Sequence, residues 1–265
     1  MADARGKAWT FDTVAGAYDK FRPGYPDELF RAIFAYRPID AASRVVEVGI
    51  GAGQATPPFL KTGCALTAVE YGEQLAQLCR EKFAAYPAFS AIAGKFEDTR
   101  FPDDAFDLVY SATAFHWVPE ELGYPQVFRM LKSGGAFARF RNHPYPGRDD
   151  PALSEAVQRA YAEYYYPYYG KAPRTPREYT VAEAEELAKV AEKYGFIDIR
   201  CAVFSRTRTF TAGEYRGLIG TYSDHITIGE PVREKFFSAV EEAIERHGGS
   251  ITIHDTIDLQ LARKP

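Results

Sequence analysis

The sequence is poor in cysteine and has no long apolar run. Cys64, Cys79 and Cys201 are widely spaced and no two are separated by two residues, so neither a disulfide framework nor a zinc site is predicted. No apolar stretch approaches the roughly 18 residues needed to cross a bilayer. The first residues lack the basic, apolar and small-residue regions of a signal peptide. We therefore expect a cytoplasmic protein that makes no use of a membrane.

An excess of positive charge is also missing. The net charge is -4, which offers no broad basic field for nucleic acid. With 46% hydrophobic and 26% charged residues, the composition is that of an ordinary globular protein. We found no internal repeat. At 265 residues the chain is expected to be one large domain, or one domain with an inserted cap, acting as a monomer or homodimer.

The most informative stretch is a β-branched run that ends in three alternating glycines, Val45-Val46-Glu47-Val48-Gly49-Ile50-Gly51-Ala52-Gly53. Val45 to Val48 favour a buried strand. The glycines allow a sharp turn and a close backbone approach to a ligand. Helix-forming residues follow, so the pattern indicates a strand, a tight turn and a helix N-terminus, an arrangement that binds nucleotide-like cofactors.

Two acidic residues narrow the choice of cofactor. Glu70 ends the next apolar run, where a carboxylate can hold ribose hydroxyls. Gly53 stands one residue before the third glycine position of a dinucleotide fingerprint, which Gln54 occupies. Glu47, two residues before the first glycine, would repel a pyrophosphate but suits a ligand with an ammonium group and no phosphate. S-adenosylmethionine is such a ligand.

Five motifs in order resemble the class I S-adenosylmethionine-dependent methyltransferases. They are Glu47 to Gly53, then Glu70, then Gly94-Lys95-Phe96-Glu97-Asp98, then Phe106 to Ser111, then Leu131 to Gly135. Two further segments resemble the small-molecule branch that includes trans-aconitate methyltransferase-like proteins. These are Tyr18 to Pro26 and Ser111-Ala112-Thr113-Ala114-Phe115-His116-Trp117. The resemblance is strong from about residue 11 to 140 and weaker beyond.

Strands alternating with helices predict an α/β fold with a parallel sheet. Strands are expected at about 44–49, 65–70, 89–93, 106–111, 136–140, 196–204 and 250–262. The resemblance implies a Rossmann-like, seven-stranded, mostly parallel sheet whose last strand is antiparallel, with helices on both faces and a helical cap over the carboxyl edge. Residues 1–265 would form one methyltransferase domain. Its core would comprise about 40–141, 181–204 and 249–262, and its cap would comprise 1–39, 142–180 and 205–248.

The cofactor site is predicted both from the residues themselves and from the resemblance to the methyltransferases. Gly49, Gly51 and Gly53 would let the backbone approach the aminoacyl part, Glu47 would face the ammonium group, and Glu70 would accept from the ribose hydroxyls. By resemblance, Tyr71 lies against the adenine, and Phe96 and Glu97 recognise the adenine edge. Asp98 would take the role of Glu97 if the motif is aligned one residue off. The resemblance also implies that Tyr18 and Arg22 fold over the methionine end and that Ser111 and Ala112 complete the site.

The acceptor side is predicted less directly. His116 follows the fourth strand, where the methyl group should be presented, and would position the acceptor or take its proton; His225 is a second candidate base. Trp117 would exclude water or face the sulfonium. Arg141, His143 and Tyr222 are candidates for substrate binding. The tyrosine-rich segment 161–169 would line an apolar cavity or, as is more common, form the core of the cap.

The sequence therefore predicts methyl transfer from S-adenosylmethionine to a small molecule, with S-adenosylhomocysteine as product and no metal. Whether oxygen, nitrogen or carbon is methylated stays open. The alternatives are an NAD(P)-dependent oxidoreductase on a similar sheet and a cofactor-binding protein without catalysis. Replacing Glu70 with Ala is expected to weaken cofactor binding by about 1–3 kcal/mol without changing the melting temperature of the free protein.

Overall fold

The computed structural model describes residues 8–265, so residues 1–7 of the predicted cap lie outside the described part. The chain divides into two compact units. The sheet unit comprises residues 23–142, 179–204 and 257–265. The helical unit comprises residues 1–22, 143–178 and 205–256. Residues 23–39 thus group with the sheet, whereas the sequence assigned them to the cap.

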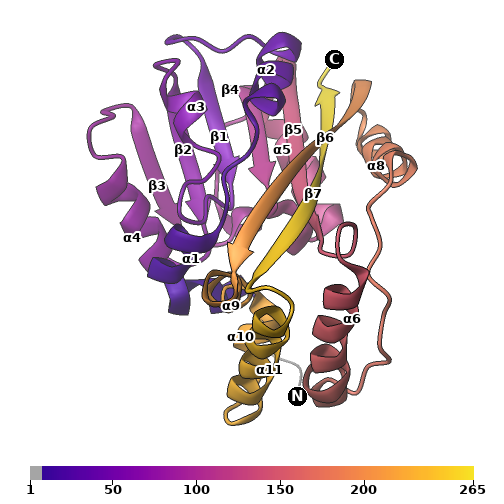
Figure 1. Cartoon of the computed structure of the whole chain (residues 1–265). Coiled ribbons are helices and arrows are strands. Elements are labelled where there is room, and N and C mark those ends of the chain that lie inside the picture. The colour runs from indigo at the N-terminus through magenta and orange to yellow at the C-terminus, as the bar shows by residue number, and fades with distance from the viewer. Residues whose placement is uncertain (1–7) are drawn as a thin grey trace. The chain divides into compact units, whose positions relative to one another are not determined.

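The sheet has seven strands in the order β3-β2-β1-β4-β5-β7-β6. Neighbouring strands from β3 to β5 are parallel and β7 is antiparallel, as Figure 1 shows. The predicted fold class, a Rossmann-like mostly parallel sheet with an antiparallel last strand, is therefore confirmed. The strands are β1 (Arg44–Val48), β2 (Ala65–Glu70), β3 (Phe89–Ala93), β4 (Phe106–Ala112), β5 (Leu131–Tyr145), β6 (Ile197–Thr211) and β7 (Ser250–Arg263).

Alternating side chains along the central strands feed two separate cores in the sheet unit. Val45 contributes to one core and Val46 to the other, and Leu108 and Val109 on β4 divide in the same way. Such two-sided burial explains why these strands are nearly continuous apolar runs. The helices and short 3-10 turns of this unit are α2 (Asp27–Tyr36), α3 (Pro57–Leu60), α4 (Glu73–Lys82), η2 (Phe96–Asp98), η3 (Phe115–Trp117), α5 (Glu120–Met130), α8 (Val181–Ala188) and η5 (Lys189–Tyr194).

The pair Gly134-Gly135, a typical helix-stop signal, does not end α5. The helix ends at Met130 and β5 begins at once, so Gly134 and Gly135 lie inside the strand. Their backbone is paired with the end of the chain: Gly134 N–H donates to the Lys264 carbonyl, and Lys264 N–H donates to the Gly135 carbonyl, each at 2.9 Å. Long-range strand pairing therefore overrides a local helix-stop signal here.

The helical unit has a third core. Its helices are η1 (Ala8–Val14), α1 (Ala15–Phe21), α6 (Pro151–Ala160), the π-helical turn η4 (Tyr161–Tyr165), α7 (Tyr166–Tyr168), α9 (Ala212–Ile219), α10 (Ser223–Ile226) and α11 (Val232–Arg246). Helix α6 lies in the 142–180 segment that the sequence analysis assigned to the cap. Its start carries a recognisable signal, because Asp150 accepts a hydrogen bond from Leu153 N–H at 2.9 Å and Pro151 follows.

The tyrosine-rich segment contributes to this core. Tyr165 is buried, and Tyr161, Tyr164, Tyr166 and Tyr169 pack against the same cluster. The Tyr165 hydroxyl donates to Asp224 Oδ2 at 2.6 Å. The segment is therefore structural in the helical unit, with its hydroxyls satisfied at the margin of the core.

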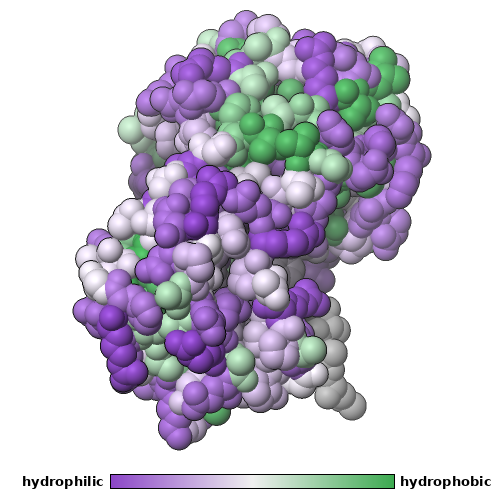
Figure 2. Space-filling model, turned by 45° about the vertical axis from the view of Figure 1, so that its right-hand side comes forward, coloured by the Kyte–Doolittle hydropathy of each residue, from purple (hydrophilic) through white to green (hydrophobic). Residues whose placement is uncertain are grey.

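The surface seen in Figure 2 is mostly hydrophilic, with a band of hydrophobic residues in the upper part of that view. Across residues 8–265, no helix is long and apolar enough to span a membrane. Within the same range, no group of three or more His, Cys, Asp and Glu side chains is placed to hold a metal ion.

Candidate cofactor site and acceptor residues

The glycine loop leaves β1 in a conformation that only glycine adopts easily. Gly49, Gly51 and Gly53 all have positive φ, at 73°, 58° and 82°. A Cβ on Gly49 would lie 2.3 Å from the Ala114 Cβ, so the loop also packs too closely there for a side chain. Gly49 N–H donates to the Val69 carbonyl at 2.8 Å, which fixes the loop against the end of β2.

Glu70 and the glycine loop are in direct contact, which the sequence analysis did not predict. Gly51 N–H donates to Glu70 Oε2 at 2.8 Å, and Gly72 N–H donates to Glu70 Oε1 at 3.1 Å. The residue is only 7% exposed. Carboxylate oxygens have more than one acceptor direction each, so an oxygen that accepts from a backbone N–H group can also accept from a ribose hydroxyl.

Glu47 is fully buried below the loop. Tyr110 Oη and Thr56 Oγ1 both donate to its Oε2, at 2.6 and 2.7 Å, while its Oε1 is buried without a hydrogen-bond partner among the described residues. Burial raises the pKa of Glu47 to about 8. The carboxyl group is therefore mostly protonated at neutral pH. This geometry weakens the expected attraction to an ammonium group.

The remaining predicted cofactor residues follow the ends of neighbouring strands. Ser111 Oγ donates to the Val48 carbonyl at 2.8 Å and joins the ends of β4 and β1. The Phe96 side chain is buried in the core, and its carbonyl accepts from Gln126 Nε2 at 2.6 Å. Three others are half-buried at strand ends: Tyr71, Glu97 and Ala112. In a parallel sheet these ends share one edge, where ligands bind in open α/β folds.

The sequence argument missed Tyr25 and Thr113. The Tyr25 hydroxyl is 2.7 Å from Thr113 Oγ1, and Asn142 N–H donates to the same oxygen at 3.2 Å. Thr113 has φ +55°, which is unusual for a β-branched residue and is held only where surrounding contacts enforce it. Tyr25 lies in a motif already used for the resemblance, but no local pattern shows that it reaches Thr113.

The acceptor candidates of the sheet unit are solvent-accessible. His116 and Trp117 are exposed on η3, with ring centroids 4.9 Å apart. Arg141 is also exposed, and its backbone N–H donates to Asp258 Oδ1 at 3.1 Å. His116 and Trp117 are thus adjacent.

Tyr18, Arg22 and Tyr222 are brought together in the helical unit. The Arg22 guanidinium lies 5.0 Å from the Tyr18 ring centroid and 4.6 Å from that of Tyr222. It also donates from Nε to Thr221 Oγ1 at 2.9 Å and from Nη2 to the Thr221 carbonyl at 2.8 Å. Two aromatic faces and two hydrogen bonds hold this cation in one orientation.

His225 does not have the surroundings of a base that meets substrate. It is 2% exposed, its Nδ1 is 2.9 Å from the Ile219 carbonyl, and its Nε2 is 3.4 Å from the Tyr161 hydroxyl. The ring packs among aromatic residues of the third core. A carbonyl partner favours the Nδ1-protonated tautomer, so His225 serves as a core residue. His143, near the end of β5, is half-buried.

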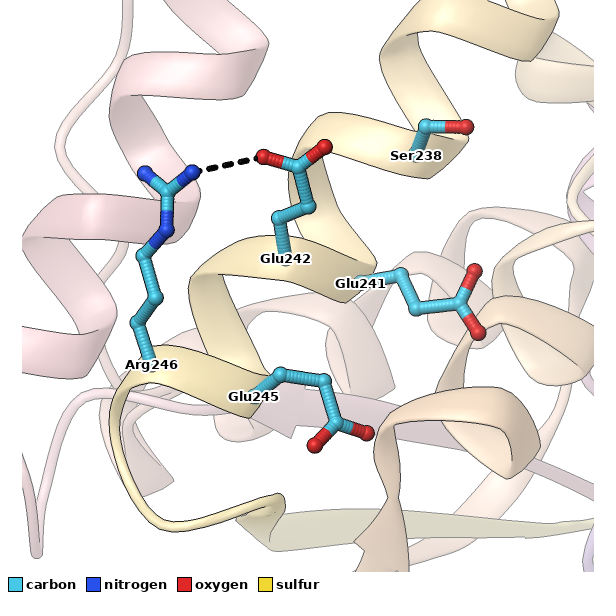
Figure 3. Close-up of a pocket in the computed structure, with 5 residues that line it drawn as sticks. All are labelled: Ser238, Glu241, Glu242, Glu245 and Arg246. Atoms are coloured by element: carbon cyan, nitrogen blue, oxygen red, sulfur yellow. Dashed lines mark hydrogen bonds and ion pairs between the residues drawn. The ribbon is translucent and has the colours of Figure 1, made fainter.

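A separate hollow of about 380 Å³ lies along α11 and is lined by Ser238, Glu241, Glu242, Glu245 and Arg246, as Figure 3 shows. Arg246 is already paired with Glu242 at 2.8 Å. Three carboxylates and no aromatic face do not suit an adenine.

Residues 46–138 match the family model described as a methyltransferase domain. This range contains the glycine loop, Glu70 and His116. The match agrees with the predicted class, a class I S-adenosylmethionine-dependent methyltransferase, over this part of the chain.

Individual proteins agree with this match. The chain is similar to an uncharacterized methyltransferase of Mycobacterium tuberculosis, with 34% identity over 131 residues, which is 49% of this chain and 51% of that protein. The chain thus spans about half the length of the curated relatives it matches at this level. A structure from Anaeromyxobacter dehalogenans, provisionally named a type II methyltransferase, is 20% identical with a TM-score of 0.63, covering 92% of this chain and 98% of that one.

A phosphoethanolamine N-methyltransferase of Haemonchus contortus is similar in structure as well. It is 16% identical with a TM-score of 0.55, covering 96% of this chain and 57% of that one. That structure contains phosphomonomethylethanolamine and S-adenosylhomocysteine. At these identities, the two structures show a shared fold.

Proposed function

We propose that the protein transfers the methyl group of S-adenosylmethionine to a small-molecule acceptor. The observation that carries this proposal is the contact between the glycine loop and Glu70 inside the matched methyltransferase domain. The loop brings backbone close to a ligand, and the carboxylate beside it suits two ribose hydroxyls. The S-adenosylhomocysteine in the Haemonchus structure supports the same choice of cofactor.

The chemistry asks little of the protein beyond positioning. The acceptor atom attacks the methyl carbon, the methyl–sulfur bond breaks, and its electron pair remains on sulfur as the sulfonium becomes a thioether. Holding the two reactants in line and excluding water supplies much of the rate. An acceptor hydroxyl, amine or carbon acid would also lose a proton, and the exposed His116 is the side chain we propose to position it or take that proton.

The finer assignments belong to the same proposal. The nucleoside part of the cofactor would be held by Glu70, Tyr71, Phe96, Glu97, Ser111 and Ala112. Its aminoacyl part would be held by Glu47 and the glycines, and its methionine end by Tyr18 and Arg22. Trp117, Arg141, His143 and Tyr222 would contact the acceptor. Two segments, Tyr18 to Pro26 and Ser111 to Trp117, support trans-aconitate methyltransferase-like proteins as our proposed branch. We further propose one methyltransferase domain whose cap comprises 1–39, 142–180 and 205–248, although residues 23–39 of this cap have their contacts within the sheet unit.

The test is a thermal-shift comparison of four ligands: S-adenosylmethionine, S-adenosylhomocysteine, and oxidised and reduced nicotinamide dinucleotide. A ligand that binds only the native state stabilises it by about 2.7 kcal/mol at a hundred times its dissociation constant. We expect a shift with the first two ligands alone. A shift with the dinucleotides alone would replace the methyltransferase by an oxidoreductase. Binding without turnover across a broad acceptor screen would favour a protein that binds the cofactor without catalysis.

A further inference from the structure

Two arginines of the helical unit share one buried carboxylate. Arg206 donates to Asp255 Oδ2 from Nε at 3.2 Å and from Nη2 at 3.0 Å. Arg208 donates to the same carboxylate from Nε and, at 2.9 Å, from Nη2 to Oδ1. The side chains are 22%, 13% and 0% exposed, for Arg206, Arg208 and Asp255. The cluster therefore holds two positive charges and one negative charge with little access to water.

One donor of this cluster is unused. Arg208 Nη1 is buried and has no hydrogen-bond partner among the described residues. An unsatisfied donor on a charged group is expensive, because the lost hydration is not replaced. Native proteins rarely leave such a group unsatisfied, and its usual partner is a bound ion, water or ligand. Arg208 Nη1 therefore needs an acceptor from outside the cluster.

Tyr222 interacts electrostatically with Arg208 of this cluster and with Arg22. Burial raises the pKa of the Tyr222 hydroxyl, the positive charges of Arg22 and Arg208 lower it, and Asp255 and Asp224 raise it. The Arg22 guanidinium also lies 4.6 Å from the Tyr222 ring centroid. Asp224 is engaged by Tyr165. A neutral hydroxyl close to a guanidinium group can donate to the same anion that the guanidinium binds.

We propose that Arg208, Arg206 and Tyr222 bind an anionic group of the acceptor molecule, a carboxylate or a phosphate. That the anion belongs to a methyl acceptor rests on the proposed methyltransferase function. The binding of the anion itself can be tested without that function. Guanidinium groups present paired donors that match the oxygens of either anion. Oxygens held by such donors are poor nucleophiles, because their charge is neutralised. The anionic group is thus a handle, and the methyl group is transferred to a different atom of the same molecule.

The experiment uses calorimetric titration of the full chain with three probes: succinate, inorganic phosphate and the neutral succinamide. We expect measurable binding of succinate or phosphate and none of succinamide, and the better of the two anions identifies the class. Equal binding of succinamide, or no binding of either anion at millimolar concentration, would overturn the proposal.

Three variants locate the binding. Arg208→Lys keeps the charge but loses the buried Nη1 donor, and Arg206→Gln removes the second cation while leaving a neutral Arg208–Asp255 pair. Each is expected to weaken anion binding tenfold or more. Arg246→Gln, an exposed residue of α11, is the matched control and should bind as the wild type does. If Arg208→Lys fails to fold, Arg206→Gln still decides, and unchanged binding in the folded variants would overturn the proposal.

The same preparations are titrated with S-adenosylhomocysteine. We expect its affinity to be unchanged in Arg206→Gln and Arg208→Lys. If the wild type does not bind S-adenosylhomocysteine, the proposed methyltransferase function is overturned, whereas the result for anion binding still holds. The two failures can therefore be told apart.

Discussion

Glu70 has two kinds of partner in our proposal, the backbone of the protein and the ribose of the cofactor. Because Gly51 and Gly72 donate to its two oxygens, Glu70→Ala removes acceptors from buried N–H groups as well as from a ligand. We expect cofactor binding to weaken by about 1–3 kcal/mol and the free protein to become less stable by a similar amount. This corrects the expectation from sequence that its melting temperature would not change.

The measurement pairs calorimetry with thermal unfolding. Glu70→Gln is the control, since its amide oxygen can still accept from one N–H group and should recover part of the stability. A Glu70→Ala protein that melts like the wild type would contradict the loop contacts, and an unchanged dissociation constant would contradict the ribose assignment.

Glu47 predicts a pH dependence of stability. Its pKa is raised by burial to about 8 from the ordinary value of 4.5. The folded protein therefore holds this proton more tightly than the unfolded chain does. The contribution of the protonated Glu47 to the free energy of unfolding is complete below pH 4.5 and is lost as the pH rises toward 8. Glu47→Gln cannot ionise, so it should gain stability relative to the wild type over this range.

Urea unfolding at pH 5, 6.5 and 8 measures this difference. The exposed Glu242→Gln on α11 serves as control and is expected to follow the wild-type profile. A constant difference between Glu47→Gln and the wild type at all three values would show that Glu47 is ionised in the folded protein.

At the scale of the element, helix starts are set by local chemistry. Thr211 and Glu214 form a capping box at α9: Glu214 N–H donates to Thr211 Oγ1 at 3.3 Å, and Thr211 N–H donates to Glu214 Oε2 at 2.9 Å. Thr211→Ala should destabilise the protein by about 1 kcal/mol, measured by urea unfolding. Thr211→Ser keeps the hydroxyl and should stay near the wild type, and an equal loss in both variants would point to packing of the methyl group.

Element prediction from sequence succeeded where the signal is local. Strands β2 and β3 lie where the sequence placed them, at 65–70 and 89–93. It failed for β5, whose start at Leu131 depends on pairing with β4 and with the chain end, and neither contact can be seen in a local window. It also shortened β6, which continues to Thr211.

At the scale of the whole molecule, the proposal assigns cofactor binding to particular segments. Saturating S-adenosylhomocysteine should slow backbone hydrogen exchange in residues 49–53, 70–72 and 94–98, because ligand contacts stabilise them against local opening. Exchange in α11 should not change. Reduced nicotinamide dinucleotide is the control and should leave all four segments as they are. Protection from exchange confined to α11 would show that the ligand binds there and would contradict the proposed cofactor site.

The sequence by itself determined the fold class and the glycine loop. Both depend on neighbours in the chain: the β-branched run of β1, the positive-φ glycines that follow it, and Glu70 at the end of the next strand. Such patterns are read locally, because strand burial and turn geometry act over a few residues.

Only the tertiary structure decided which polar residues meet. Thr113 joins Tyr25 across 88 positions of sequence, and Arg208 joins Asp255 across 47. It also showed that His225 is buried in the core of the helical unit, although histidine is a frequent catalytic residue. These contacts arise when distant segments pack together, and packing depends on volumes and registers that no local pattern encodes.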